Sequence, residues 1–322
     1  MSRPVARLSA LACCLLLSLS TIACQVSPDP PAELPAEPKT SLPEAELTVD
    51  KPPFDYPGGW VGDACVDICG VTEGSPVERP LAVVCFDPDD ADCAAKTGDG
   101  DYDYLLLSQH WLPSMCLGLD AGYDTTLTHQ AGARCVPEAP SRITVHGLWP
   151  NYTRGFPQCC GSALPLDPAK VRQWPEELRT SLQHSQPDPT TTDFDPAICE
   201  IFNHEWQKHG TCFAAGGDGA GDVDADARHY FETGLLLADR LLEADNTLDG
   251  WAGTTQPRAA VEALYPKAVQ VLCDAHQIER LLEIHTCWSR DLEMVDCPHT
   301  DGFGPLKTCG DGVTIPEWGE GS

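Results

Sequence analysis

The sequence predicts an α+β fold in which helices pack on a central, mostly antiparallel β-sheet that is rich in disulfides. Apolar runs bounded by Gly and Pro predict strands at residues 104–111, 142–146, 268–273 and 281–287. Apolar residues at helical spacing predict helices at residues 168–183, 198–210 and 225–244. Strands and helices follow one another in mixed order without a repeating βαβ pattern, and this favours α+β.

Residues 1–23 are predicted to be an export signal. A basic start is followed by an apolar run that is too short to span a bilayer comfortably. The run ends in TIAC, which resembles a bacterial lipoprotein cleavage box with Cys24 as the lipid-bearing residue. We expect a membrane anchor on Cys24; ordinary secretion, with Cys24 free or paired, is the alternative. Residues 24–57 are rich in Pro, Glu and Ala and are expected to form an extended tether.

The cysteine count supports export independently. The chain has 17 cysteines, and 14 remain when Cys13 and Cys14 of the signal and Cys24 are set aside. An even number of cysteines in an exported chain is most simply a disulfide framework. Residues 58–100 contain Cys65, Cys69, Cys85 and Cys93. This segment is expected to be a small appendage closed by two local bridges, followed by a main domain at 101–311 and a tail at 312–322.

The stretch HEWQKHG, His204 to Gly210, concentrates ionisable side chains on one helix. At about 100° per residue, with His204 as zero, Lys208 lies near 40°, Glu205 near 100° and His209 near 140°. These four side chains therefore share one side of the predicted helix. A zinc site is disfavoured, because histidines five residues apart diverge on an α-helix and Lys208 occupies the usual ligand position. A merely solvated helix face is the other alternative.

A second stretch, ITVHGLWPNY, places His146 at the predicted end of a strand. Gly147 is expected to let the chain turn sharply there and to expose the imidazole ring. Trp149 and Tyr152 follow and offer flat faces on which a nucleobase could stack. A histidine beside exposed aromatic side chains argues against the purely solvated reading of the first stretch.

Two separated histidines, a lysine and a carboxylate suit RNA cleavage by transphosphorylation. One imidazole removes the proton of the ribose 2′-hydroxyl, and another protonates the leaving 5′-oxygen. A cation stabilises the charge that develops on the phosphoryl oxygens. Because the nucleophile belongs to the substrate, the reaction needs neither a metal nor a cofactor.

The segments HGLWPNY and HEWQKHGTC resemble the two active-site segments of the T2 family of acid ribonucleases. The likeness runs from about residue 101 to about residue 309 and includes YLLLSQHWLPSMC and QWPEEL. The resemblance implies that His146 is the general acid and His209 the general base. It also implies that Glu205 and Lys208 stabilise the transition state. His204 is implied to bind phosphate.

The same resemblance implies where bases bind. Trp149 matches the aromatic side chain of the first base site, and Asn151 stands where some relatives have Asp. Gln109 matches a glutamine that contacts the second base in some relatives. His110 and His285 match no catalytic position and are expected to be structural.

The resemblance further implies part of the disulfide pairing. The implied pairs are Cys212 with Cys159 or Cys160, Cys287 with Cys297, and Cys273 with Cys309.

The sequence therefore predicts an exported, monomeric endoribonuclease that cleaves single-stranded RNA to 2′,3′-cyclic phosphate ends with broad base tolerance. The formal net charge of −29 is unusual for a protein with a polyanionic partner, so the negative surface is expected to lie away from the cleft. A zinc-dependent hydrolase and an RNA-binding module without turnover are the alternatives.

Overall fold

The structure is a computed structural model of the chain. The predicted signal and tether lie outside the residues that it describes, which are 59–70, 83–87, 89–98, 100–125, 129, 132–161, 164–213, 222–298 and 306–319.

The described residues contain an eight-stranded sheet that carries most of the fold. Its largest strands lie side by side in the order β8 (Gln270–Asp274), β9 (Gln277–Trp288), β4 (Tyr104–Trp111) and β5 (Ile143–Asn151), and each neighbouring pair is antiparallel. The shorter strands are β7 (Thr254–Pro257), β10 (Met294–Val295), β11 (Leu306–Thr308) and β12 (Gly312–Ile315). Only β12 and β9 pair in parallel among these strands. The predicted α+β class with a mostly antiparallel sheet is confirmed.

Strand β5 is longer than the sequence predicts. It continues through Gly147 and Pro150, which were expected to end it, and Pro150 lies opposite Leu105 of β4. β5 pairs with β4 alone in this sheet. A proline is tolerated on such an edge strand because its missing N–H would face away from the partner. The expected tail likewise begins with β12, which pairs with β7.

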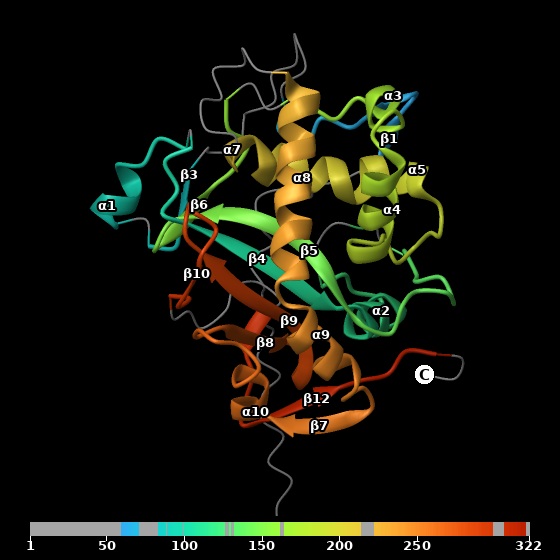
Figure 1. Cartoon of the computed structure of the whole chain (residues 1–322), viewed down its shortest axis with the longest axis vertical. Helices are drawn as coiled ribbons and strands as arrows, with labels where there is room; N and C mark the ends of the chain where they lie inside the picture. Colours follow the sequence, from blue (N-terminus) through green and yellow to red (C-terminus); the bar gives the residue numbers. More distant parts are fainter. Residues whose placement is uncertain are drawn as a thin grey trace, which may run out of the picture. The chain divides into compact units, whose positions relative to one another are not determined.

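Helices cover the sheet where the sequence places them, with two interruptions. The predicted helix at 168–183 is split into α3 (Pro168–Val171) and α4 (Glu176–Ser185), because Pro175 cannot donate a helical hydrogen bond. The predicted helix at 225–244 becomes α8 (Val223–Asp239) and α9 (Leu242–Asp249). Figure 1 shows the long helix α8 lying across β4 and β5. No helix in the described ranges is long and apolar enough to cross a membrane.

The predicted helix at 198–210 is the middle of a longer helical run, which we call the active-site helix (residues 194–213). It consists of α5 (Phe194–Ala197), the π-helical turn η1 (Ile198–Phe202), α6 (Asn203–Glu205), the π-helical turn η2 (Trp206–Gly210) and α7 (Thr211–Phe213). The remaining short elements are α1 (Ala91–Ala94), α2 (Leu112–Asp120), α10 (Arg258–Glu262), β1 (Trp60–Val61), β2 (Ala64–Cys65), β3 (Val83–Cys85) and β6 (Gly155–Pro157).

The main core lies between the sheet and the helices. It includes Leu105 and Leu107 of β4, Leu148 of β5, and Tyr230 and Phe231 of α8, all of which are buried. Trp206 of the active-site helix also packs into this core. The helix is therefore fixed on one side by apolar packing.

Seven disulfides cross-link the described residues. Those that the resemblance anticipates are Cys160–Cys212, Cys273–Cys309 and Cys287–Cys297, and the others are Cys65–Cys199, Cys69–Cys159, Cys85–Cys93 and Cys116–Cys135.

The expectation of two local bridges within residues 58–100 is wrong. Cys85–Cys93 is local, but Cys65 and Cys69 pair with cysteines 134 and 90 positions away in the main domain. In the chain-entropy account, closing a loop of such length stabilises a fold by about 4–5 kcal/mol. We call residues 59–70 the strap, because they are bonded covalently to the active-site helix and to the segment that follows β6.

Gln109 points to the core side of the sheet. Its neighbours on β4, Ser108 and His110, contact Glu283 and His146 on the other face, and side chains alternate along a strand. The Gln109 amide donates to Asp245 of α9 at 2.9 Å. Burial raises the pKa of Asp245 to about 7, although the bond from Gln109 opposes this.

We expect Asp245→Asn to stabilise the protein above neutral pH. Because the folded pKa of Asp245 exceeds its ordinary value of 3.8, the folded state holds a proton that the unfolded state releases between about pH 4 and 7. Stability of the parent therefore falls as pH rises through this window, and the variant lacks this loss. Thermal melts at pH 5 and pH 8 measure it, with the exposed Asp239→Asn as control. An equal Tm difference at both pH values contradicts the assignment.

Candidate active site

The active-site helix brings His204 and His209 together. Their ring centroids are 6.2 Å apart. The prediction that the two rings diverge is wrong, because it assumes α-helical geometry, whereas residues 206–210 form a π turn. In a π-helix, residues five apart are hydrogen-bonded neighbours on successive turns, and such turns frequently occur at functional sites.

His146 is presented by a bulge in β5. Ser108 of β4 lies opposite Gly147 and Gln109 lies opposite Val145, so His146 is the extra residue between them. A bulge re-aims the side chain that it carries, and bulges are common beside active sites. Gly147 serves a different purpose from the sharp turn that was expected. A Cβ at this position would lie 1.8 Å from Oε2 of Glu205, so only glycine permits the close approach.

The His146 ring lies between two buried carboxylates. Its Nδ1 is 2.9 Å from Oε1 of Glu283, and its Nε2 is 3.6 Å from Oε1 of Glu205. Burial alone would lower the pKa of His146. The adjacent charges, first that of Glu283 and then that of Glu205, outweigh burial and raise this pKa above its ordinary value. His146 therefore keeps its proton to a higher pH than an ordinary histidine does.

Glu283 is a buried residue that sequence reasoning missed. It accepts hydrogen bonds from the Ser108 hydroxyl at 3.0 Å and from Nε2 of His285 at 2.6 Å, besides contacting His146. Burial raises the pKa of Glu283, but the charge of His146 and the hydrogen bonds from His146 and His285 outweigh it and hold the pKa well below its usual range. The signal was available in the sequence, as an acidic residue inside the apolar run LLEIHTC. A carboxylate there needs a buried cationic partner.

Trp149 lies between the two catalytic segments. Its ring contacts His146 edge-on, with centroids 5.0 Å apart, and stacks on His209 with centroids 5.1 Å apart. Its Nε1 donates to Oε2 of Glu205 at 2.8 Å. The structure thus brings His146 and His209, which are distant in sequence, to the same indole.

The imidazoles of the active-site helix differ from His146 in charge. Burial, reinforced by the neighbouring Lys208 charge, lowers the pKa of both His204 and His209 well below the ordinary value. Burial also raises the pKa of Glu205, against the opposing His146 charge, and lowers the pKa of the half-buried Lys208. His209 is therefore neutral under conditions in which His146 is protonated.

Three of these side chains could hold a metal ion. One ligand atom each from His204, Glu205 and His209 lies within 4.8 Å of the others. Nitrogen and carboxylate ligands suit zinc. The argument against zinc from diverging rings therefore fails, and the argument that remains is the Lys208 ammonium, which repels a cation.

Two of the side chains expected near a base do not reach the site. Gln109 is bonded to Asp245 on the opposite face of the sheet. Tyr152 is 1% exposed and its hydroxyl donates to Asp101 at 2.6 Å, so its ring is no platform for a base. Asn151 is buried beside Trp149, and its amide donates to the Trp149 carbonyl at 3.1 Å.

His110 packs against the His146 ring. Its ring stacks on the His146 ring, with centroids 5.3 Å apart and an interplanar angle of 28°. Burial, with a further contribution from the His146 charge, lowers the pKa of His110 to about 3. A neutral ring there packs against His146 without competing for its charge.

Residues 102–297 match the ribonuclease T2 family. The chain belongs to the ribonuclease T2 family. The matched region contains both His146 and the active-site helix, whereas the strap lies outside it. The chain is therefore an endoribonuclease, as the sequence predicts.

Relatives support this assignment over most of their length. Ribonuclease 1 of Arabidopsis thaliana is 26% identical over 240 residues, which cover 70% of this chain and 91% of that protein. Ribonuclease T2 of Sus scrofa is 24% identical over 234 residues, covering 66% and 95%. Among solved structures, RNase NT in complex with 5′-AMP has a similar fold, with a TM-score of 0.50 and 21% identity over 67% of this chain and 99% of that one.

We expect Glu283→Gln to reduce activity and change its pH dependence. The substitution keeps a side chain of similar shape but removes the charge that raises the His146 pKa. His146 then loses its proton at lower pH, so the basic limb of the pH–kcat profile moves to lower pH. We expect kcat to fall by about 10- to 100-fold, a part of what general acid catalysis contributes. The exposed Glu279→Gln on the same strand is the control. A basic limb at its parental position contradicts the role of Glu283.

Proposed function

We propose that the enzyme cleaves RNA by transphosphorylation with His146 as general acid and His209 as general base. The observation that supports this most is the opposite displacement of two pKa values at one indole: that of His146 is raised and that of His209 is lowered. Titratable groups whose environments push their pKa values apart are the usual acid and base of an active site. At mildly acidic pH one imidazole can give a proton while the other accepts one.

In the proposed reaction, His209 takes the proton of the ribose 2′-hydroxyl and the 2′-oxygen attacks the phosphorus. The bond from phosphorus to the 5′-oxygen breaks, and His146 delivers its proton to that oxygen. The products are a 2′,3′-cyclic phosphate and a free 5′-hydroxyl. No metal or other cofactor takes part, since the substrate supplies the nucleophile.

The other residues of the site would stabilise charge. The Lys208 ammonium would meet the negative phosphoryl oxygens, which accumulate charge in the transition state. Glu205 lies beside Nε2 of His146 and would keep that ring oriented as it gives up its proton. His204 is proposed to bind phosphate. Trp149 and Asn151, which is bonded to the Trp149 carbonyl, are proposed to bind a base, whereas Gln109 is bonded to Asp245 on the opposite face of the sheet. The Trp149 indole is consistent with broad base tolerance.

Single-stranded RNA is the proposed substrate, because its unpaired bases are accessible. DNA lacks the 2′-hydroxyl and should not be cut. The net charge of −29 slows the approach of RNA at neutral pH, and partial protonation of carboxylates at lower pH reduces this repulsion.

We expect His146→Ala and His209→Ala each to reduce kcat by about 10²–10⁴-fold, the usual contribution of one proton transfer. The parent should give a bell-shaped pH–kcat profile. Its acidic limb lies below the ordinary histidine pKa, because His209 must be neutral, and its basic limb lies above it, because His146 must be protonated. Digestion of single-stranded RNA in chelator, with analysis of the product ends, measures this. Undiminished cutting by either variant contradicts the assignment.

The same digestion tests a zinc-dependent reaction as the alternative. The His204, Glu205 and His209 cluster is the observation that favours it, and chelator would then abolish cutting. Full activity in chelator supports the proposed metal-independent reaction.

We propose that the enzyme is exported as a monomer and held at a membrane by a lipid on Cys24. The signal-like run before Cys24, the Pro-rich segment after it and the disulfides support this.

We expect Cys24→Ser to move the enzyme from the membrane fraction to the soluble exported fraction without loss of specific activity, because a lipid chain supplies the anchor. Cell fractionation followed by an RNA digestion assay measures this. Cys13→Ser, inside the predicted signal, is the control. Membrane association that survives Cys24→Ser contradicts the lipid anchor.

A further inference from the structure

We propose that the strap, residues 59–70, positions the catalytic side chains by holding the active-site helix in its π-helical register. This inference rests on the proposed roles of Glu205, Lys208 and His209. The strap lies outside residues 102–297, which match the ribonuclease T2 family. Membership of the family therefore does not assign it a role.

The strap follows one stripe of the helix. Cys199, Asn203 and Gln207 recur every four residues, so they share a helix face, and each of them contacts the strap. Cys65 is disulfide-bonded to Cys199, and the Asn203 amide donates to the Val66 carbonyl at 2.9 Å. Successive residues of the strap therefore contact successive turns of the helix.

Gln207 is the most completely bonded residue of this stripe. Its Nε2 donates to Oδ1 of Asp67 at 2.6 Å, and its Oε1 accepts from the Ile68 amide at 3.0 Å. The Cys69 amide also donates to Oδ1 of Asp67, at 3.0 Å. Gln207 is fully buried, so losing these partners would leave its amide unsatisfied.

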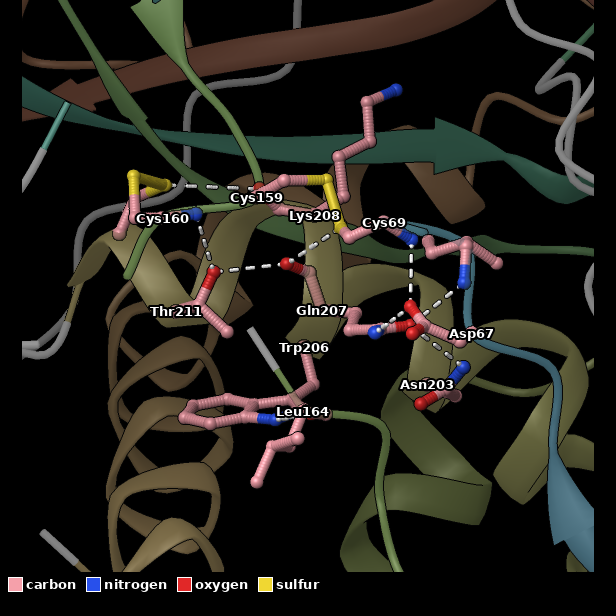
Figure 2. Close-up of a disulfide and its surroundings, with 12 residues drawn as sticks. Asp67, Cys69, Cys159, Cys160, Leu164, Asn203, Trp206, Gln207, Lys208 and Thr211 are labelled. Carbon is pink, nitrogen blue, oxygen red and sulfur yellow. Dashed lines mark hydrogen bonds between the residues drawn. A yellow bond between two sulfur atoms is a disulfide. The ribbon is translucent and has the colours of Figure 1, made fainter. Parts of the chain in front are cut away.

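A second disulfide of the strap, Cys69–Cys159, lies beside the turn that carries Lys208 and His209. Cys69 is bonded to Cys159, and the Cys159 amide donates to the Lys208 carbonyl at 2.9 Å. The Thr211 hydroxyl accepts from the Cys160 amide and donates to the Gln207 carbonyl. Figure 2 shows the Gln207 side chain reaching Asp67 while the Lys208 side chain extends to another side of the helix.

The contacts with the strap fix the π turn that carries the proposed catalytic residues. Residues 206–210 form the π turn that brings His209 beside His204. Isolated π turns are rare, and an uncommon backbone conformation persists only where its surroundings fix it. An α-helical turn would instead separate these two rings by about 140° around the helix axis. The strap supplies fixed partners on the face opposite the catalytic side chains.

The first test removes one acceptor and leaves all disulfides intact. Asp67→Ala deletes the oxygen that Gln207 and the Cys69 amide share, whereas Asp67→Asn keeps an acceptor at that place. We expect Asp67→Ala to lower kcat by about tenfold, on the scale of one lost buried hydrogen bond, with little change in KM. We expect Asp67→Asn to retain parental activity.

The pH profile separates positioning from general loss of stability. When the π turn relaxes, His209 becomes better solvated and its pKa rises toward its ordinary value of 6.5. The acidic limb of the pH–kcat profile for Asp67→Ala should therefore move to higher pH. A variant that was only less stable would keep the parental limb.

The second test removes the covalent link. Cys69→Ser with Cys159→Ser should reduce kcat and move the acidic limb in the same way. The matched control is Cys85→Ser with Cys93→Ser, which removes a local bridge that does not touch the active-site helix. If the first pair does not fold, the Asp67 variants still decide the question.

Two outcomes are distinguishable. Folded Asp67→Ala and Cys69→Ser/Cys159→Ser proteins with parental kcat and pH profile, alongside an inactive His209→Ala, would overturn the role of the strap alone. An active His209→Ala would instead overturn the proposed mechanism on which it rests.

Discussion

The π turn at residues 206–210 is the constraint on which the active site depends. It places His209 beside His204 and against Trp149, and Trp149 is in turn bonded to Glu205 and in contact with His146. On a helix of ordinary pitch the His204 and His209 rings would instead lie about 140° apart around the helix axis. The catalytic arrangement therefore depends on a backbone conformation as much as on the residues that it carries.

Burial makes the charges of the site depend on one another. The His146 ring lies between Glu283 and Glu205, and the adjacent Lys208 charge favours neutral imidazoles at His204 and His209. In a dry environment each charge is felt strongly by its neighbours, so one rigid arrangement can hold one imidazole protonated and another neutral. The glycine at 147 is what allows Glu205 to approach this closely, and the bulge in β5 carries His146.

The sequence predicts the fold class, most strands and helices, and the two segments that carry the site, because each rests on local pattern. What it does not predict is set by distant contacts. Gly147 and Pro150 were expected to end β5, but pairing with β4 carries the strand past both. Tyr152 and Gln109 were expected at the site, but Asp101 and Asp245 bind them elsewhere. Glu283 and the strap were missed as parts of the site because their partners lie far away in the chain.

Glu283 and the strap both support a segment of the site from a distant part of the chain. Glu283 supports His146 from β9, and the strap supports the active-site helix from outside the region that matches the family. Each contacts its catalytic segment through buried polar groups, which are costly unless they are all satisfied. In the proposed mechanism, the two segments that carry His146 and His209 supply the reacting groups, and their supports set the distance between those groups. Because rate depends steeply on that distance, a chain could keep both motifs intact and still lose most of its turnover if either support were removed.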